Sequence, residues 1–390
     1  MRRICSTILL FFALLSTGCP VDSSISMPTA EPLSSEGSVG AAVSSDGVEL
    51  LQLIDQTLDH NLRQRRLSSE THGAWQILHG MLAYGSSLAI ETPEGDQPAL
   101  EYLISGGSVL GFEPLAGDAF PLAKSLRQPH PESDLRTIGF EDHDQRSGLR
   151  MPMDPSSKVG QGHRDQWLAI LSQCELPIET QIQSIDREYT IGDWLRQAEY
   201  DVPRNFEREF SWSLIALTKY FDTNHAWLAS DGTEYSTELL LMSEVDFAED
   251  LQSGVCGGTH RLIGIAMALA RRRAEGNPIT GVWKRAEETV NSNLALAKQN
   301  QNPDGTYSTN YLHRTGWTQD LGESLGTTGH VLEFVAIAAP QETLNEAWVK
   351  RSASKVCSML EQCEQIDLEC GVLYHALHGL QEYAARCRAQ

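Results

Sequence analysis

The chain has 390 residues, of which 52 are acidic and 30 are basic, so its formal net charge at pH 7 is -22. Nucleic acids and polyanionic glycans are bound through clustered cations, so this balance excludes both as expected partners. Hydrophobic residues make up 41% of the chain, which is enough for a sizeable core. The length allows two or three domains, or one large helical domain.

The first 19 residues, 1–19, are expected to be a targeting segment. A basic pair precedes the apolar stretch Ile8–Leu15, which is too short to span a bilayer. Ser16-Thr-Gly-Cys19 resembles a bacterial lipoprotein cleavage box, in which Cys19 becomes the lipid-bearing residue, although an aliphatic residue is usual where Ser16 stands. An ordinary signal peptide is the alternative. Both interpretations predict an exported protein, either a membrane-anchored lipoprotein or a periplasmic or secreted protein.

Residues 20–47 are rich in Ser, Pro, Ala and Gly and are expected to form a flexible linker. From residue 48 onward apolar residues recur at three-and-four spacing, which predicts helices. Amphipathic helices precede more apolar ones. Equivalent points in the apolar helices recur at steps of 92, 45, 48, 70 and 45 residues, at Trp75, Trp167, Trp212, His260, His330 and His375. A step near 45 is what two helices and two loops require.

Six such pairs predict an all-α fold, an (α/α)6 toroid of helical hairpins that occupies residues 48–390 as a single domain, with the apolar helices inside. The two longer steps place loop insertions at residues 106–162 and 302–327, each between an outer helix and the next inner helix. Both insertions are expected on the face where the inner helices begin. In such toroids the central cavity opens at that face. The first is expected to form an ordered cap.

Polar residues mark the expected starts of the inner helices, where unpaired backbone N–H groups suit ligands. Cys256 and His260 lie four residues apart across a Gly-Gly turn, and His330 is expected to begin the next inner helix. One thiolate and two imidazoles provide three ligands of a tetrahedral zinc site and leave a fourth position for water or substrate. Zn²⁺ is therefore the candidate cofactor. The alternative is that these side chains only cap helix ends.

Three further residues are candidates for acid, base or nucleophilic chemistry at the same face. His163 and Glu209 precede inner helices, and Asp320 lies in the second insertion. Glu209 and Asp320, or Glu323, would supply the acid and base of a carbohydrate-active toroid. A nucleophilic cysteine–histidine pair within the Gly-rich turn is a less favoured alternative, because residues so close rarely have the orientation that thiolate activation needs. The sequence contains no serine-hydrolase elbow, P-loop or zincin helix.

Cysteines are concentrated in the last expected helical pair. In an exported protein this clustering predicts disulfides that clamp the C-terminus. Three pairings are open for the four residues Cys357, Cys363, Cys370 and Cys387.

The helix-pair pattern, together with one motif, resembles the terpenoid-cyclase and protein-prenyltransferase superfamily. In that superfamily a Gln, an Asp-Gly and an aromatic residue recur at the end of an outer helix. The matching residues here are Gln301, Asp304, Gly305 and Tyr307. The resemblance implies the α/α toroid.

The resemblance also bears on the metal site. Prenyltransferases hold zinc with an Asp and a Cys two residues apart and with a His of a later inner helix. Cys256 and His330 look like the last two, whereas Gly254 stands in the place of the aspartate, so His260 would have to substitute. The Asp-rich acid motif of squalene cyclases is absent, and so is the glutamine of complement-like thioester domains.

A second resemblance covers most of the chain. Gly160–His163, Cys256–Arg261 and Thr327–His330 are similar to segments of a group of secreted planctomycete-type proteins, which brings no established activity.

Three hypotheses for the function follow. The first is an exported toroid of prenyltransferase and squalene-cyclase type, with a metal site at the cavity mouth and an uncharged or lipidic substrate. The second is a non-catalytic binding or cell-envelope scaffold module. The third is a carbohydrate-active (α/α)6 enzyme. The expected partners are a small-molecule, lipid or glycan ligand in the central cavity and, if Cys19 is lipidated, the membrane.

Overall fold

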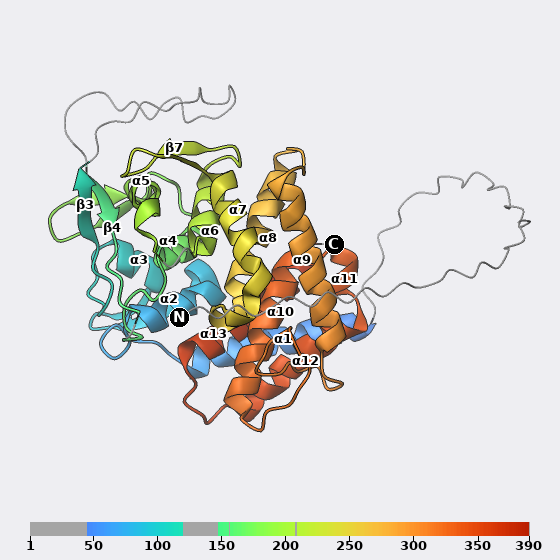
Figure 1. Ribbon diagram of the computed structural model, residues 1–390. Helices are drawn as coiled ribbons and strands as arrows, with labels where there is room; N and C mark the ends of the chain where they lie inside the picture. The colour runs from blue at the N-terminus through green and yellow to red at the C-terminus, as the bar shows by residue number, and fades with distance from the viewer. Residues whose placement is uncertain (1–44, 120–146, 156, 207–208, 390) are drawn as a thin grey trace, which may run out of the picture. The chain divides into compact units, whose positions relative to one another are not determined.

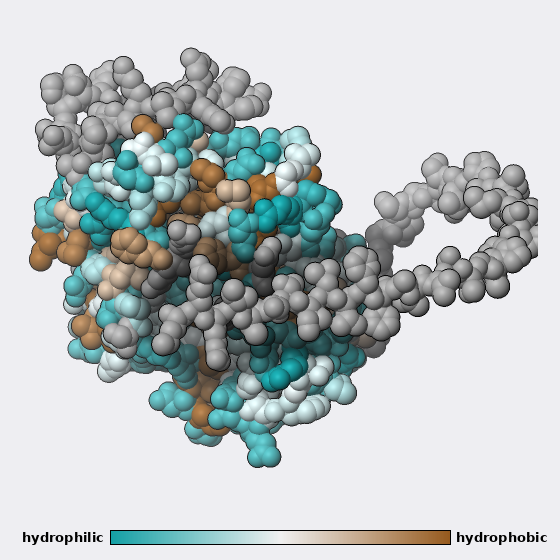
Figure 2. All heavy atoms as spheres, viewed as in Figure 1, coloured by the Kyte–Doolittle hydropathy of each residue, from teal (hydrophilic) through white to brown (hydrophobic). Residues whose placement is uncertain are grey.

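The computed structural model describes residues 45–119, 147–155, 157–206 and 209–389 (Figure 1). The expected targeting segment with Cys19, most of the linker 20–47 and residues 120–146 of the first insertion lie outside the described residues. Among the described helices, none is both long and apolar enough to cross a membrane. On the face shown in Figure 2, hydrophobic residues lie in small groups among hydrophilic ones.

Six helices bury most of their residues, because apolar and small side chains surround most of their circumference. Each of them contacts the next in chain order, and the last contacts the first, so the order of contacts is closed. We call them the inner helices: α2 (Ala74–Tyr84), α4 (Gln166–Ser172), α6 (Ser211–Tyr220), α8 (Thr259–Ala274), α10 (Leu321–Ala338) and α13 (Cys370–Arg388).

Each inner helix is preceded in the chain by a helix that buries a smaller share of its residues. In α9, for example, Trp283, Ala286, Val290 and Ala297 form one buried face at helical spacing. These outer helices are α1 (Ser45–Gln64), α3 (Ala99–Ile104), α5 (Ile191–Asp201), α7 (Thr237–Phe247), α9 (Val282–Asn300) and α12 (Ala347–Gln362), and the short α11 (Gln341–Leu344) precedes α12. The predicted alternation of outer and inner helices is present.

The described chain also contains four antiparallel two-stranded sheets, which the expectation of an all-α fold did not include. A mostly helical fold is therefore confirmed, with small strands added. Three of the sheets end directly at the start of an outer helix, where Thr190 and Ser236 cap α5 and α7. The strands are β1 (Ala89–Thr92) with β2 (Gly95–Pro98), β3 (Leu115–Ala119) with β4 (Ser147–Arg150), β5 (Gln181–Gln183) with β6 (Glu188–Thr190), and β7 (Ala226–Leu228) with β8 (Glu234–Ser236).

Helix α10 begins earlier than the sequence suggests. It starts at Leu321, so His330 lies in its third turn, and the expected insertion 302–327 overlaps its first two turns. Asp320 caps the helix by accepting a hydrogen bond from the backbone N–H of Glu323. Glycines near its start make this stretch resemble a loop, but they allow a close helix contact instead.

That close contact joins α10 and α13. A Cβ atom added at Gly329 would lie 2.6 Å from the Cβ of Ala376, and one added at Gly379 would lie 2.8 Å from the backbone nitrogen of Glu333. Because such distances are shorter than van der Waals contact, only glycine fits at both crossings. The two helices therefore pack backbone against backbone, which brings their polar side chains together.

We expect Gly329→Ala to lower the free energy of unfolding by about 1–3 kcal/mol, because the added methyl group must push α10 and α13 apart. Alanine has the higher helix propensity, so a loss of stability would be due to the contact and not to the helix itself. Gly192→Ala is the matched control, since the nearest atom to its added Cβ would be 3.4 Å away. Urea unfolding of both variants measures the difference. Equal stability of the two would contradict the close contact.

The described cysteines are all free thiols, which corrects the prediction of disulfides near the C-terminus. Cys370 and Cys387 lie near opposite ends of α13, about 25 Å apart along its axis. Cys357 and Cys363 are separated by about 9 Å of rise along α12 and its C-terminal cap. A disulfide requires Cα atoms within about 7 Å of each other, so neither pair can form one.

Candidate metal centre

The Gly-rich turn before α8 places Cys256 in a conformation that few residues adopt. Cys256, Gly257 and Gly258 have φ angles of 51°, 62° and 77°, three consecutive left-handed residues. Glycine adopts this region readily, whereas a cysteine there is strained. A Cβ added at Gly257 would lie 2.4 Å from the ring of Tyr311, so no larger residue fits. The turn thus requires the two glycines, and it holds Cys256 in a strained conformation.

This turn brings together the three residues that the sequence analysis selected as metal ligands. Cys256 comes from the turn, His260 from the first turn of α8 and His330 from the third turn of α10. One ligand atom from each lies within 4.8 Å of the others. Both imidazoles are buried, with exposed fractions of 5% and 4%. The cluster could therefore hold a metal ion.

The imidazole nitrogens support this interpretation. His330 Nδ1 lies 2.7 Å from the carbonyl oxygen of Gly326, to which it donates, so the lone pair is on Nε2. That Nε2 and both nitrogens of His260 are buried, and the sulfur of Cys256 is their one hydrogen-bond partner among the described residues. Buried polar atoms are almost always paired. A metal-bound histidine characteristically donates its other N–H to a carbonyl or carboxylate, as His330 does.

The charges of the cluster favour the form of cysteine that binds metals. Burial raises the pKa of Cys256, but the adjacent His330 and His260 outweigh it and hold this pKa well below its usual range. Burial lowers the pKa of His330, but the charge of Cys256 raises it to about 9. The pair therefore exists as a thiolate and an imidazolium when no metal is bound, and the thiolate is the ligand form.

A second group of buried polar residues, which the sequence analysis did not select, lies next to the cluster. Glu333 accepts from His375 Nδ1 at 2.8 Å and from His378 Nδ1 at 2.6 Å. The ring of His375 lies 4.2 Å from that of His330 and 5.0 Å from that of His260, measured between centroids. Burial raises the pKa of Glu333, but the two histidines hold it well below its usual range.

His79 of α2 completes this buried group, since its ring centroid is 5.5 Å from that of His375. Its Nδ1 lies 2.6 Å from the carbonyl oxygen of Trp75. Burial and the neighbouring His375 lower the pKa of His79 to about 3, so the ring is neutral. In the sequence, His79 stands inside an otherwise apolar helix. It was not predicted as a site residue because only polar residues at helix starts were considered.

Two of the three predicted catalytic candidates lie near the cluster. His163 Nδ1 is 2.7 Å from Glu209 Oε2, and both side chains are mostly buried. The ring of His163 lies 5.5 Å from that of His260. Burial raises the pKa of Glu209, but the hydrogen bond and charge of His163 lower it further. The structure thus joins two residues that are 46 apart in sequence.

The third candidate, Asp320, lies elsewhere. It is the exposed N-terminal cap of α10, and the helix rises by about 15 Å between it and His330. Glu323 is exposed as well and accepts a hydrogen bond from Thr318 at 3.0 Å. The structure therefore does not bring either carboxylate to the cluster.

The loop between α9 and α10 covers the Gly-rich turn. His313 Nε2 lies 2.9 Å from the carbonyl oxygen of Gly257. The ring of Tyr311 is 6.1 Å from that of His330, and burial and the nearby Cys256 raise the pKa of its hydroxyl. This loop therefore supplies one wall of the candidate site.

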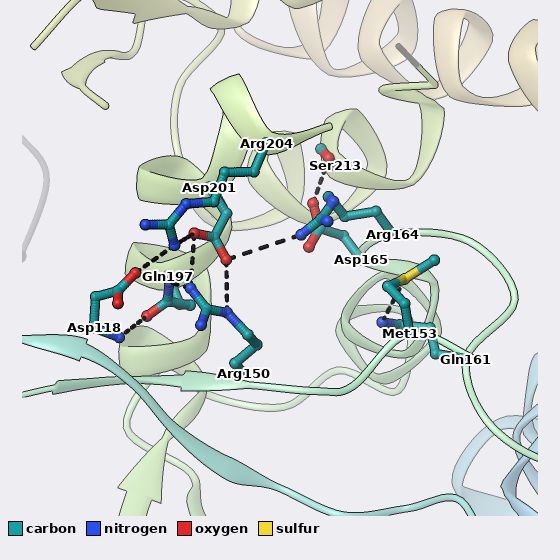
Figure 3. A network of polar contacts seen from close by, with 10 residues as sticks. All are labelled: Asp118, Arg150, Met153, Gln161, Arg164, Asp165, Gln197, Asp201, Arg204 and Ser213. Atoms are coloured by element: carbon teal, nitrogen blue, oxygen red, sulfur yellow. Dashed lines mark hydrogen bonds and ion pairs between the residues drawn. The ribbon is translucent and has the colours of Figure 1, made fainter. Parts of the chain in front are cut away.

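A network of ion pairs connects β3, β4 and α5 with Arg164 (Figure 3). Arg150 of β4 donates to Asp201 of α5 and to Asp118 of β3, each at 2.9 Å. Arg204 contacts the same two carboxylates, of which Asp201 is almost fully buried. Arg164, the residue after His163, lies 3.9 Å from Asp201. The network ties the two strands of the first insertion to α5 and so positions His163.

Comparison of the chain with protein-family models, with curated proteins and with solved structures finds no match. The motif that resembles terpenoid cyclases and prenyltransferases forms a turn against α12. Within it, Gln301 donates to the carbonyl oxygen of Trp348 at 2.8 Å and accepts from Arg351 at 2.7 Å. Gly305 has a φ of 95°, and Tyr307 is buried. The motif thus connects α9 to the next outer helix.

Proposed function

We propose that this protein is a metalloprotein with an (α/α)6 toroid fold, in which Cys256, His260 and His330 hold Zn²⁺. The closed order of contacts among the six inner helices supports the toroid, as does the outer helix that precedes each of them. The resemblance to terpenoid cyclases and prenyltransferases supports it as well, because members of that superfamily share this fold.

The observation that carries the proposal is the set of buried imidazole nitrogens whose one hydrogen-bond partner among the described residues is the sulfur of Cys256. Thiolate and imidazole are the ligands that zinc prefers, whereas calcium and magnesium require oxygen ligands. Three protein ligands with an open fourth position are typical of catalytic zinc sites, since structural sites have four. We therefore propose a catalytic site.

Bound zinc would supply a Lewis acid with one open coordination position. Beside it, Glu209 accepts the hydrogen bond of His163 Nδ1 and orients this imidazole as a general base. Tyr311 and the loop that carries it exclude water from one side. The net charge of -22 disfavours anionic substrates, so we propose a metal-assisted reaction on an uncharged or lipidic substrate.

Metal analysis of the purified wild-type chain tests this proposal. We expect about one zinc ion per chain, and less than about a tenth of that in Cys256→Ala. Cys174→Ala is the matched control, because Cys174 is also a free thiol but is not part of the cluster, and it should keep the metal. A wild-type protein without stoichiometric zinc after growth in zinc-containing medium would overturn the proposal.

The thiolate–imidazolium pair also supports a second candidate function, nucleophilic catalysis by Cys256. In this case the thiolate would attack an acyl carbon and His330 would protonate the leaving group. The partner of the cysteine is then His330 of the next inner helix, and not His260 of the same turn. The other hypotheses, a scaffold module and a carbohydrate-active enzyme, stay as alternatives, although the position of Asp320 gives the latter no acid–base pair with Glu209.

We expect the rate at which iodoacetamide alkylates Cys256 of the metal-free protein to rise less between pH 6 and pH 8 than that of an ordinary thiol, because the pKa of Cys256 lies well below its usual range. Cys174, whose pKa burial raises to about 11, should react only at alkaline pH. Peptide mapping by mass spectrometry gives both rates. A Cys256 rate that rises about tenfold per pH unit, as for an ordinary thiol, would contradict the ion pair.

A further inference from the structure

A cavity of about 320 Å³ lies at the opposite ends of the inner helices from the candidate metal centre. The metal ligands His260 and Cys256 lie at the N-terminus of α8, whereas the cavity is lined by residues near the C-terminal ends of α4, α6 and α10. Its volume is in the range of small-molecule sites. The side chains that carry the argument are Ile215, Met267, Ile337, Ser172, Thr218 and Glu382.

The hydroxyl groups that line this cavity present hydrogen-bond acceptors. Ser172 Oγ and Gln173 Nε2 both donate to the carbonyl oxygen of Ala169, at 2.7 and 3.0 Å. Thr218 Oγ1 donates to the carbonyl oxygen of Leu214 at 2.6 Å. Because a hydroxyl has one proton, these oxygens can only accept from a ligand. A ligand that donates hydrogen bonds therefore fits the lining.

The charges at the cavity favour a cation. Lys219 is paired with Glu175 at 2.6 Å and Arg271 with Glu275 at 2.7 Å, so both positive side chains are neutralised. The C-terminal ends of helices add partial negative charge. The remaining charged lining residue is Glu382, and burial raises its pKa while His378 lowers it further, so that it is a carboxylate.

Glu382 is also held in place from inside the protein. Its Oε1 lies 3.6 Å from His378 Nε2, and the opposite nitrogen of the same ring donates to Glu333. Because His378 faces Glu333 on one side and Glu382 on the other, its positive charge is divided between two carboxylates. Glu382 therefore keeps part of its negative charge available to a ligand in the cavity.

We propose that this cavity is a second binding site, which takes a small organic ammonium ion whose N–H groups contact Glu382 and the hydroxyl oxygens and whose hydrocarbon part packs on Ile215, Met267 and Ile337. The apolar side chains explain why an organic ion fits better than a bare metal ion. The charge-assisted hydrogen bond to Glu382 provides the selectivity for a cation. The site requires no metal at the other end of the helices.

Calorimetric titration of the full chain with hexylammonium, hexanoate and hexanol tests the proposal, because these probes share one hydrocarbon chain and differ in charge. We expect hexylammonium to bind at least about tenfold more tightly than either other probe. In Glu382→Gln this preference should fall by about tenfold. Glu364→Gln is the control, because Glu364 is an exposed glutamate that does not line the cavity, and it should keep the preference.

A second variant tests the same cavity independently, in case Glu382→Gln does not fold. Met267→Trp should fill the cavity from another wall and abolish hexylammonium binding without changing a charge. Cys256→Ala should bind hexylammonium as the wild type does, so failure of the zinc proposal and failure of this one can be told apart. Absence of hexylammonium binding, equal binding of hexanoate, or an unchanged preference in Glu382→Gln would overturn the proposal.

Discussion

Replacing His330 by alanine is expected to weaken zinc binding by more than about a hundredfold. Loss of a residue that merely orients a ligand costs about 10- to 100-fold in affinity, and loss of the ligand itself should exceed that. His330 contributes the buried Nε2 and also the imidazolium that keeps Cys256 ionised. Its removal therefore eliminates one ligand and raises the pKa of another.

Competition with a chromophoric zinc chelator at pH 7 measures the affinity of the wild type and the variant. His225→Ala is the control, because His225 is a partly buried histidine, paired with Glu199, that is not part of the cluster. It should bind zinc as the wild type does. If His330→Ala and His225→Ala bind zinc equally well, the metal is held elsewhere.

Replacing Glu333 by glutamine is expected to destabilise the fold by about 3–5 kcal/mol near pH 6, because it leaves the buried charge of His378 with only the more distant Glu382 as a carboxylate partner. Glu333 and both of its histidine partners are almost fully buried, at 2%, 3% and 7% side-chain exposure, so solvent cannot compensate. The amide can accept one of the two hydrogen bonds that the carboxylate accepts.

The effect depends on pH in a defined direction. The folded pKa of Glu333 is depressed below its ordinary value of 4.5, so its contribution is present above that pH and is lost as the pH falls. The folded pKa of His378 is raised from 6.5 to about 10, so its contribution is complete below pH 6.5 and is lost as the pH rises to about 10. The difference in unfolding free energy between wild type and Glu333→Gln should therefore be largest between pH 4.5 and 6.5.

Urea unfolding of both proteins at pH 6 and pH 9 measures this difference. Glu364→Gln is the control, because Glu364 also faces a histidine, His60, but at the exposed surface, where such a pair contributes little. Its cost should stay below about 1 kcal/mol at both pH values. A cost for Glu333→Gln that is small, or that is the same at pH 6 and pH 9, would show that the pair is not ionised in the fold.

Local patterns in the sequence were sufficient for the helices and for much of the candidate site. Apolar spacing predicted the alternation of outer and inner helices, because a helix that packs on one side needs a stripe of three-and-four periodicity. The Cys-Gly-Gly-Thr-His segment predicted a turn before a helix. Cys256 and His260 lie at the start of one inner helix and His330 lies in the next. If consecutive helix pairs are neighbours in space, the three residues are expected to lie close together.

Other features of the structure could not be predicted from the sequence, for physical reasons. Strands of three or four residues are too short to show a period of two, so the small sheets before α3, α5 and α7 went unpredicted. The longer step between His260 and His330 was assigned to an insertion that ran to residue 327, because the contacts of Gly326 and Gly329 with α13 cannot be seen in the sequence. The spacing of cysteines in the sequence does not give the distance between them in a pair of packed helices. Disulfides were therefore expected near the C-terminus, where the structure has free thiols.

The turn at Cys256 and the order of the helices could thus be predicted from the sequence, because both depend on residues that are close together in the chain. The buried group of Glu333, His375 and His378, and the cavity beside Glu382, were decided only by tertiary packing. Glu333 is 42 residues from His375, and it meets that ring because Gly329 and Gly379 let α10 and α13 approach closely. This contact depends on how the surfaces of the two helices fit together, and a local sequence pattern does not contain that information.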